Sequence, residues 1–134
     1  GHGAVVETVG NTDCHIILRG GTRGPNYDDA SVADAVAGLT KAGLAPKVMI
    51  DCSHANSGKD HIRQAEVARE IAATIREACA AGEESPISGV MLESFLVAGA
   101  QSTDATPLTY GQSVTDKCMA WTPTAEVLEV LANI

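Results

Sequence analysis

Three apolar runs that read as buried strands, each followed by a helical pattern, constrain the fold of this chain more than any other feature. The runs are Cys14–Leu18, Lys47–Asp51 and Ile87–Leu92. Helical periodicity follows at 28–42, at 57–81 and, after a longer segment, from about 122 to 134. Strands that alternate with helices at this spacing predict a parallel sheet with right-handed crossovers. Aromatic residues make up only 3% of the chain, which fits a core of Val, Ile, Leu and Ala between helices and a buried sheet.

Two segments lie outside this alternation. Residues 3–9 have the composition of a further strand, closed by a Gly10-Asn11 turn. The segment from Phe95 to Ala120 shows no clear periodicity, and so long a loop in a compact domain is usually functional. Three β-α units bury little surface, whereas a complete (β/α)8 barrel takes about 250 residues. We therefore expect residues 1–134 to form one α/β domain that is part of a (β/α)8 barrel.

The charge and the cysteines narrow the classes of partner and compartment. A net charge of −8 argues against nucleic acid as the main partner and provides no basic patch for a membrane. Anionic substrates are still allowed, because local clusters outweigh net charge inside a site. The four cysteines lack zinc-finger spacing and read as reduced thiols, and no signal peptide is visible, so we expect a cytoplasmic protein. Gly1-His2, without an initiator Met, is either a tag remnant or the middle of a longer protein.

Each predicted strand ends in a side chain that can do chemistry. Arg19, His54 and Glu93 occupy these ends, and the carboxyl ends of parallel strands meet at one edge. Arg offers a planar fork for phosphate or carboxylate, while His and Glu bind divalent metals. Taken singly, each has a structural alternative: a surface salt bridge, a hydrogen-bonded core histidine or a turn cap. Three at equivalent positions favour a site, to which Asp116, one carboxylate in a polar loop, adds a weaker candidate.

Six runs, in order along the chain, carry a resemblance to a known family. They are Gly1–Val6, Asp13–Gly21, Pro25–Tyr27, Val48–Ser57, Gly89–Ser94 and Tyr110–Cys118. These runs resemble the class I 3-deoxy-D-arabino-heptulosonate 7-phosphate (DAHP) synthases of the microbial type. The resemblance is specific, because the runs are long and extend over nearly all 134 residues.

The resemblance implies a fold and an activity. It places the chain at the C-terminal part of a (β/α)8 barrel, strands six to eight with their helices, without the N-terminal strands. Residues 1–9 would be one arm of an inserted antiparallel hairpin. The activity it implies is a metal-dependent transferase reaction that condenses phosphoenolpyruvate with erythrose 4-phosphate. This reaction is the first step of the shikimate pathway and leads to the aromatic amino acids.

The same resemblance implies roles for particular residues. By match to the family's motifs, His54, Glu93 and Asp116 are metal ligands, and His54 also serves the substrate site and catalysis. Arg19 binds phosphoenolpyruvate and Asp116 lies beside the aldehyde substrate, and the resemblance counts both among the catalytic residues. Mn²⁺, Fe²⁺, Co²⁺ and Zn²⁺ all suit such ligands, and the sequence does not choose among them. The hairpin helps to form an aromatic amino-acid pocket in feedback-regulated members, which implies that Val6 lines such a pocket.

The chain departs from the family's pattern in two ways, and these departures leave alternative interpretations open. The fourth metal ligand, a cysteine, and most of the phosphate-binding residues belong to earlier strands, and no cysteine of this chain matches that position. The segment 77–88 is also a few residues longer than the pattern. We therefore expect an isolated chain to hold part of a site and to associate, either as a homo-oligomer or with the missing barrel half. The alternatives are an inactive fragment and a small standalone α/β binding module without catalysis.

Overall fold

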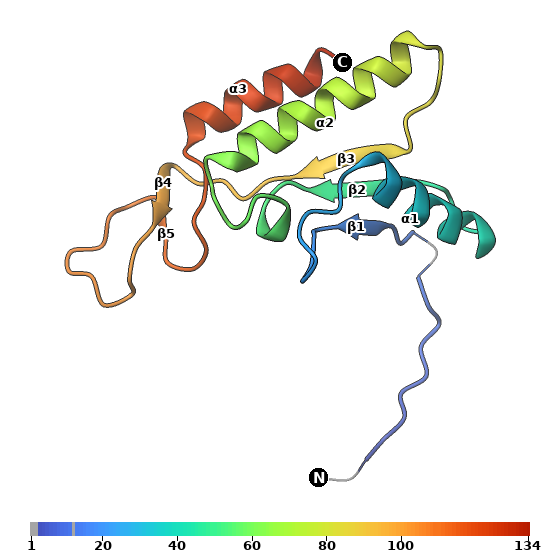
Figure 1. The fold of residues 1–134 in the computed structure, drawn as a ribbon. Helices are drawn as coiled ribbons and strands as arrows, with labels where there is room; N and C mark the ends of the chain where they lie inside the picture. The colour runs from blue at the N-terminus through green and yellow to red at the C-terminus, as the bar shows by residue number, and fades with distance from the viewer. Residues whose placement is uncertain (1–2, 12) are drawn as a thin grey trace.

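The computed structural model describes residues 3–11 and 13–134, and a three-stranded parallel sheet lies at its centre (Figure 1). The strands are β1 (Ile16–Leu18), β2 (Val48–Asp51) and β3 (Ile87–Met91), in the order β1-β2-β3. Both pairings are parallel, so the three carboxyl ends meet at one edge. The predicted parallel sheet is confirmed; the first strand is two residues shorter than expected.

Three helices complete the α/β architecture: α1 (Asp29–Lys41), α2 (Arg63–Ala80) and α3 (Trp121–Ala132). The helix α1 begins where the sequence predicts, because the Asp28 carboxylate accepts a hydrogen bond from the Ser31 N–H at 3.0 Å. In Figure 1, α2 and α3 lie side by side over the β3 side of the sheet, and α1 contacts β2. Between the layers lies an aliphatic core that includes Leu18, Val32, Leu39, Val48, Ile50, Val67, Ala68, Ile71, Ile87 and Val127. No helix in the described part of the chain is long and apolar enough to cross a membrane.

The helix α2 begins later than the sequence predicts. A helix was expected over 57–81, but a short 3-10 helix at His54–Asn56 and a series of turns precede Arg63. Gly58 and Lys59 have φ values of 63° and 61°, in the left-handed region that a right-handed helix excludes. The prediction for 57–62 is therefore wrong, and these residues instead form the connection that leads from β2 to α2.

The segment 95–120 is more ordered than the sequence predicts. It contains two short parallel strands, β4 (Val97–Ala100) and β5 (Gln112–Ser113). The end of the segment returns to β3, where the Met119 N–H donates to the Glu93 carbonyl at 2.9 Å. Strands this short leave no periodicity in the sequence, so an irregular loop was the wrong expectation in part. The returning chain brings the turn at residues 114–117 back to the carboxyl edge of the sheet.

The expected strand over residues 3–9 is wrong for this structure. Residues 3–11 form no strand, and they extend away from the rest of the chain (Figure 1). Val5, Val6 and Val9 are almost fully exposed. A strand needs a neighbour that satisfies its backbone groups, and no described segment pairs with this one. A hairpin arm in the whole protein stays a prediction, and Gly1, His2 and Thr12 lie outside the described residues.

Candidate metal site

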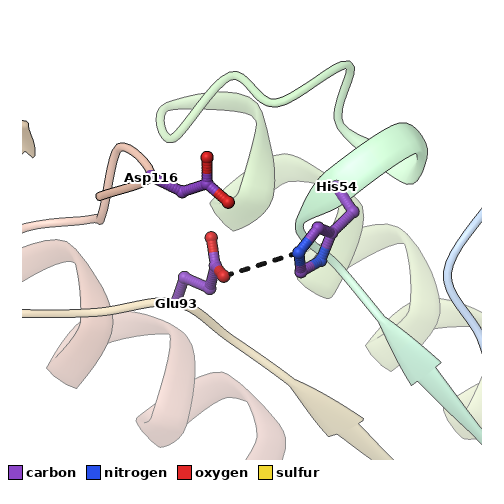
Figure 2. Close-up of side chains that lie close together, drawn as sticks. All are labelled: His54, Glu93 and Asp116. Atoms are coloured by element: carbon purple, nitrogen blue, oxygen red, sulfur yellow. Dashed lines mark ion pairs between the residues drawn. The ribbon is translucent and has the colours of Figure 1, made fainter. Parts of the chain in front are cut away.

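Three side chains from three separate segments converge at the carboxyl edge of the sheet. His54 follows β2, Glu93 follows β3, and Asp116 lies in the turn after β5 (Figure 2). One nitrogen or oxygen atom from each lies within 4.8 Å of the others. Within the group, His54 Nε2 lies 3.6 Å from Glu93 Oε1. Among the described residues, this is the one group of three such side chains that could hold a metal ion.

The orientation of His54 is set by the buried carboxylate of Asp51. His54 Nδ1 lies 2.8 Å from Asp51 Oδ2, and Asp51 is only 2% exposed. The other carboxylate oxygen accepts from the backbone N–H and the hydroxyl of Ser53, at 2.8 and 2.5 Å. With the Nδ1 proton donated to Asp51, the lone pair of Nε2 points toward Glu93. A metal-binding histidine typically has this arrangement, with its second nitrogen held by a carboxylate.

Glu93 is anchored through its backbone by the first turn of α2. The Glu93 N–H donates to the side-chain oxygen of Gln64 at 2.9 Å, and Gln64 is 1% exposed. The carboxylate itself is about one-third exposed and faces the imidazole of His54. The first turn of α2 thus holds the backbone of the residue that carries this carboxylate.

Asp116 is the most exposed member of the group, at 51%, and it faces a cation. The ammonium of Lys59 lies 3.6 Å from Asp116 Oδ1. Lys59 is held by its own N–H, which donates to the His54 carbonyl at 2.7 Å. The turn that carries His54 thus also places a positive charge beside the second carboxylate of the site.

The donor set fits a divalent metal. One imidazole nitrogen and two carboxylates suit Mn²⁺, Fe²⁺, Co²⁺ and Zn²⁺, and the restraint on His54 Nδ1 is the feature such a site requires. The nearby thiol of Cys52 does not add to the set. Burial, and then the charge of Asp51, raise the pKa of Cys52 to about 12, so this thiol is neutral near pH 7. Cys52 is also fully buried and does not belong to the group of side chains that could hold an ion.

Arg19 and Val6 lie outside this group. Arg19 directly follows β1 at the same edge of the sheet, and its side chain is exposed. The next residue, Gly20, has φ 74°, and a Cβ at that position would lie 2.7 Å from the Cβ of Ala55. The Arg19 turn therefore packs directly on the His54 turn. Val6 is 81% exposed within the extended segment 3–11, which the structure does not bring to the site.

Several residues that build the site were missed by the sequence analysis. The sequence predicted no role for Asp51, Gln64 or Lys59. Asp51 nevertheless lies three residues before His54, at the end of a strand. That spacing was the available signal, because a short turn brings residues three apart together. Gln64 gave no signal: a buried amide in an amphipathic helix is recognised only from its contact with Glu93.

Comparisons with known proteins agree over almost the whole chain. The model of the DAHP synthetase I family matches residues 2–129. A phospho-2-dehydro-3-deoxyheptonate aldolase from Corynebacterium glutamicum is 53% identical over 96% of this chain and 35% of its own length. The Phe-sensitive enzyme of that name from Escherichia coli is 51% identical over 99% of this chain and 37% of its own length.

A solved structure of this kind of aldolase, from Francisella tularensis, superposes with a TM-score of 0.85 at 50% identity. It covers 97% of this chain and 36% of its own chain. The chain thus spans little more than a third of the length of the relatives that it matches. The family model matches almost the whole chain, and the relatives are about 50% identical to it. This chain belongs to the DAHP synthetase I family.

Proposed function

We propose that these residues are the C-terminal part of a (β/α)8 barrel in a metal-dependent DAHP synthase. The whole protein would condense phosphoenolpyruvate with erythrose 4-phosphate, giving DAHP and phosphate, at the start of aromatic amino-acid biosynthesis. The observation that supports this best is the convergence of His54, Glu93 and Asp116, with His54 oriented by Asp51, in a member of this family. The relatives that it matches carry the name of the aldolase.

Different residues of this chain would bind the metal and the anionic substrate. His54, Glu93 and Asp116 hold the divalent ion, and Asp51 keeps the His54 proton on Nδ1 so that Nε2 is free to coordinate. When bound, such an ion supplies a Lewis acid that polarises the aldehyde carbonyl of erythrose 4-phosphate. Arg19 binds the anionic phosphoenolpyruvate through its planar guanidinium and orients it for attack on that carbonyl.

The experiment that tests the function uses the full-length protein that contains these residues. Phosphate release should require both substrates and Mn²⁺, and a chelator should stop it. The isolated chain should show no turnover, since the family's cysteine ligand and most phosphate-binding residues lie on earlier strands. A full-length protein that is loaded with metal and shows no condensation would contradict the proposal and favour the binding-module alternative.

Replacing Arg19 by alanine in the full-length protein should weaken phosphoenolpyruvate binding without weakening metal binding. A charged, bidentate contact is lost, which corresponds to about a tenfold to hundredfold rise in Kd. Titration calorimetry with phosphoenolpyruvate and, separately, with Mn²⁺ measures both affinities. Arg23→Ala, a neighbouring arginine of the same loop, is the control and should bind both ligands as the wild type does. Unchanged phosphoenolpyruvate affinity in Arg19→Ala would remove this role.

The isolated chain should associate with itself or with the remainder of its barrel from another chain. In the described part of the chain, β1 pairs with β2 on one side and with no strand on the other. Phe95, Leu96 and Val97 also remain substantially exposed at the carboxyl edge. An unpaired strand edge beside exposed apolar side chains favours association. Sedimentation velocity at micromolar concentration tests this, and a well-folded monomer would argue against a partial barrel.

The effector pocket is proposed on the resemblance alone. The relative from Escherichia coli is named Phe-sensitive, and we expect inhibition of the whole protein by an aromatic amino acid with Val6 in the pocket. Val6→Asp should then relieve inhibition, because a carboxylate in an apolar pocket is unfavourable. Val5→Asp is the matched control, since neighbours on a hairpin arm face opposite sides. Inhibition curves that Val6→Asp leaves unchanged would exclude Val6 from the pocket.

A further inference from the structure

We infer that Asn26 and Asn56 are a pair of positioning residues that set the placement of Arg19 relative to the His54 turn. The inference rests on the proposed function, in which Arg19 binds the anionic substrate and His54 binds the metal. Neither asparagine is a proposed ligand of the substrate or the metal. They act on the backbone from which the two functional side chains project.

The side chain of Asn56 joins three segments. Asn56 is fully buried, and its Nδ2 donates to the Leu18 carbonyl at 3.0 Å and to the Asp51 carbonyl at 2.8 Å. Its Oδ1 accepts from the backbone N–H of Asn26 at 2.9 Å. The amide therefore uses both of its donors, and it links the end of β1, the end of β2 and the loop before α1.

The side chain of Asn26 extends this link to the other side of Arg19. Its Oδ1 accepts from the backbone N–H of Gly20 at 2.6 Å. Both neighbours of Arg19 are therefore held, Leu18 through its carbonyl by Asn56 and Gly20 through its N–H by Asn26. The same Asn56 holds the carbonyl of Asp51, the residue that orients His54.

Close packing leaves these two turns little freedom to shift. A Cβ on Gly20 would lie 2.9 Å from the backbone of Ala55, which stands between His54 and Asn56. Contact and hydrogen bonds together make the two turns one rigid unit. A change in this network should therefore alter the alignment of substrate and metal, since small displacements of positioning groups have large effects on binding and rate.

The decisive variant is Asn26→Ala in the full-length protein. Asn26 is only partly buried, and it is the Asn26 side chain that accepts the hydrogen bond from the Gly20 N–H. We expect the Kd for phosphoenolpyruvate to rise about tenfold, as the loss of one hydrogen bond allows, with the Kd for Mn²⁺ nearly unchanged. Ser88→Ala is the matched control. The Ser88 hydroxyl donates to the Val48 carbonyl at 3.0 Å on the same sheet, at the end away from the site. That variant should lose stability and keep both affinities.

A double-mutant cycle separates positioning from general stability. If Asn26 acts through Arg19, Asn26→Ala in an Arg19→Ala background should weaken phosphoenolpyruvate binding no further. Full additivity would overturn the inference, as would wild-type phosphoenolpyruvate affinity in Asn26→Ala. Asn56→Ala should weaken binding of both ligands, and a folded Asn56→Ala protein with both affinities intact would remove Asn56 from the pair. A wild-type protein that binds neither ligand overturns the proposed function, and the inference with it.

Discussion

Replacing His54 and Glu93 together by alanine in the full-length protein will abolish tight metal binding and metal-dependent turnover. The two side chains approach within 3.6 Å and would provide two of the three ligand atoms proposed for this chain. Loss of a group that only supports a ligand costs about tenfold to a hundredfold in metal affinity, so loss of two ligands should cost more. Asp116→Ala, which removes the third ligand, should also abolish turnover. Titration calorimetry with Mn²⁺ and the phosphate-release assay measure the two effects.

The control for this variant removes the same residue types elsewhere. His15 and Glu77 are exposed and lie outside the group at the sheet edge, so replacing both by alanine should leave Mn²⁺ affinity unchanged. The fold should survive in both double variants, because His54 and Glu93 are partly exposed and are not part of the aliphatic core. Wild-type Mn²⁺ affinity in the His54/Glu93 double variant would refute the site assignment, whatever the fold of the whole protein.

Replacing Asp51 by asparagine should impair the metal site although Asp51 would not touch the metal. The carboxylate accepts the Nδ1 proton of His54, whereas an asparagine amide at that oxygen position would donate a hydrogen bond to Nδ1. The imidazole should then carry its proton on Nε2, the nitrogen that faces Glu93. Metal would have to displace that proton, so we expect affinity for Mn²⁺ to fall by about tenfold to a hundredfold.

Two measurements check this prediction. Nitrogen NMR of the metal-free protein reports the tautomer of His54, and calorimetry reports the metal affinity. Asp60→Asn is the matched control, because the exposed Asp60 carboxylate accepts a hydrogen bond from the Ile62 N–H and lies 3.8 Å from His61 Nδ1, away from the group at the sheet edge. An asparagine oxygen can accept the same hydrogen bond. If Asp51→Asn leaves the proton on Nδ1 and the affinity unchanged, the buried carboxylate does not orient the histidine.

The elements that were predicted well are those whose signal is local. The strand β2 contains the apolar run Val48–Ile50, β3 is mostly apolar, and α1 combines apolar periodicity with an Asp28 cap and a Gly43 stop. These features depend on residues a few positions apart, which a single sequence displays. The same holds for His54 and Glu93, because their position at the ends of adjacent parallel strands was enough to predict that they meet.

The sequence by itself therefore determined the parallel α/β core and named His54, Glu93 and, mainly through the resemblance, Asp116, while the tertiary structure decided how these side chains meet. Asp116 reaches the group only because the chain after β5 returns to Glu93. The network of Asn56 likewise depends on partners elsewhere in the chain, and residues 3–9 form no strand because no described segment pairs with them. The side chain of Asn56 forms hydrogen bonds with Asn26 and Leu18, which lie 30 and 38 positions earlier in the chain. Such contacts exist only once the backbone has folded, since a hydrogen bond needs its partner within about 3 Å, and no periodicity in the sequence specifies that partner.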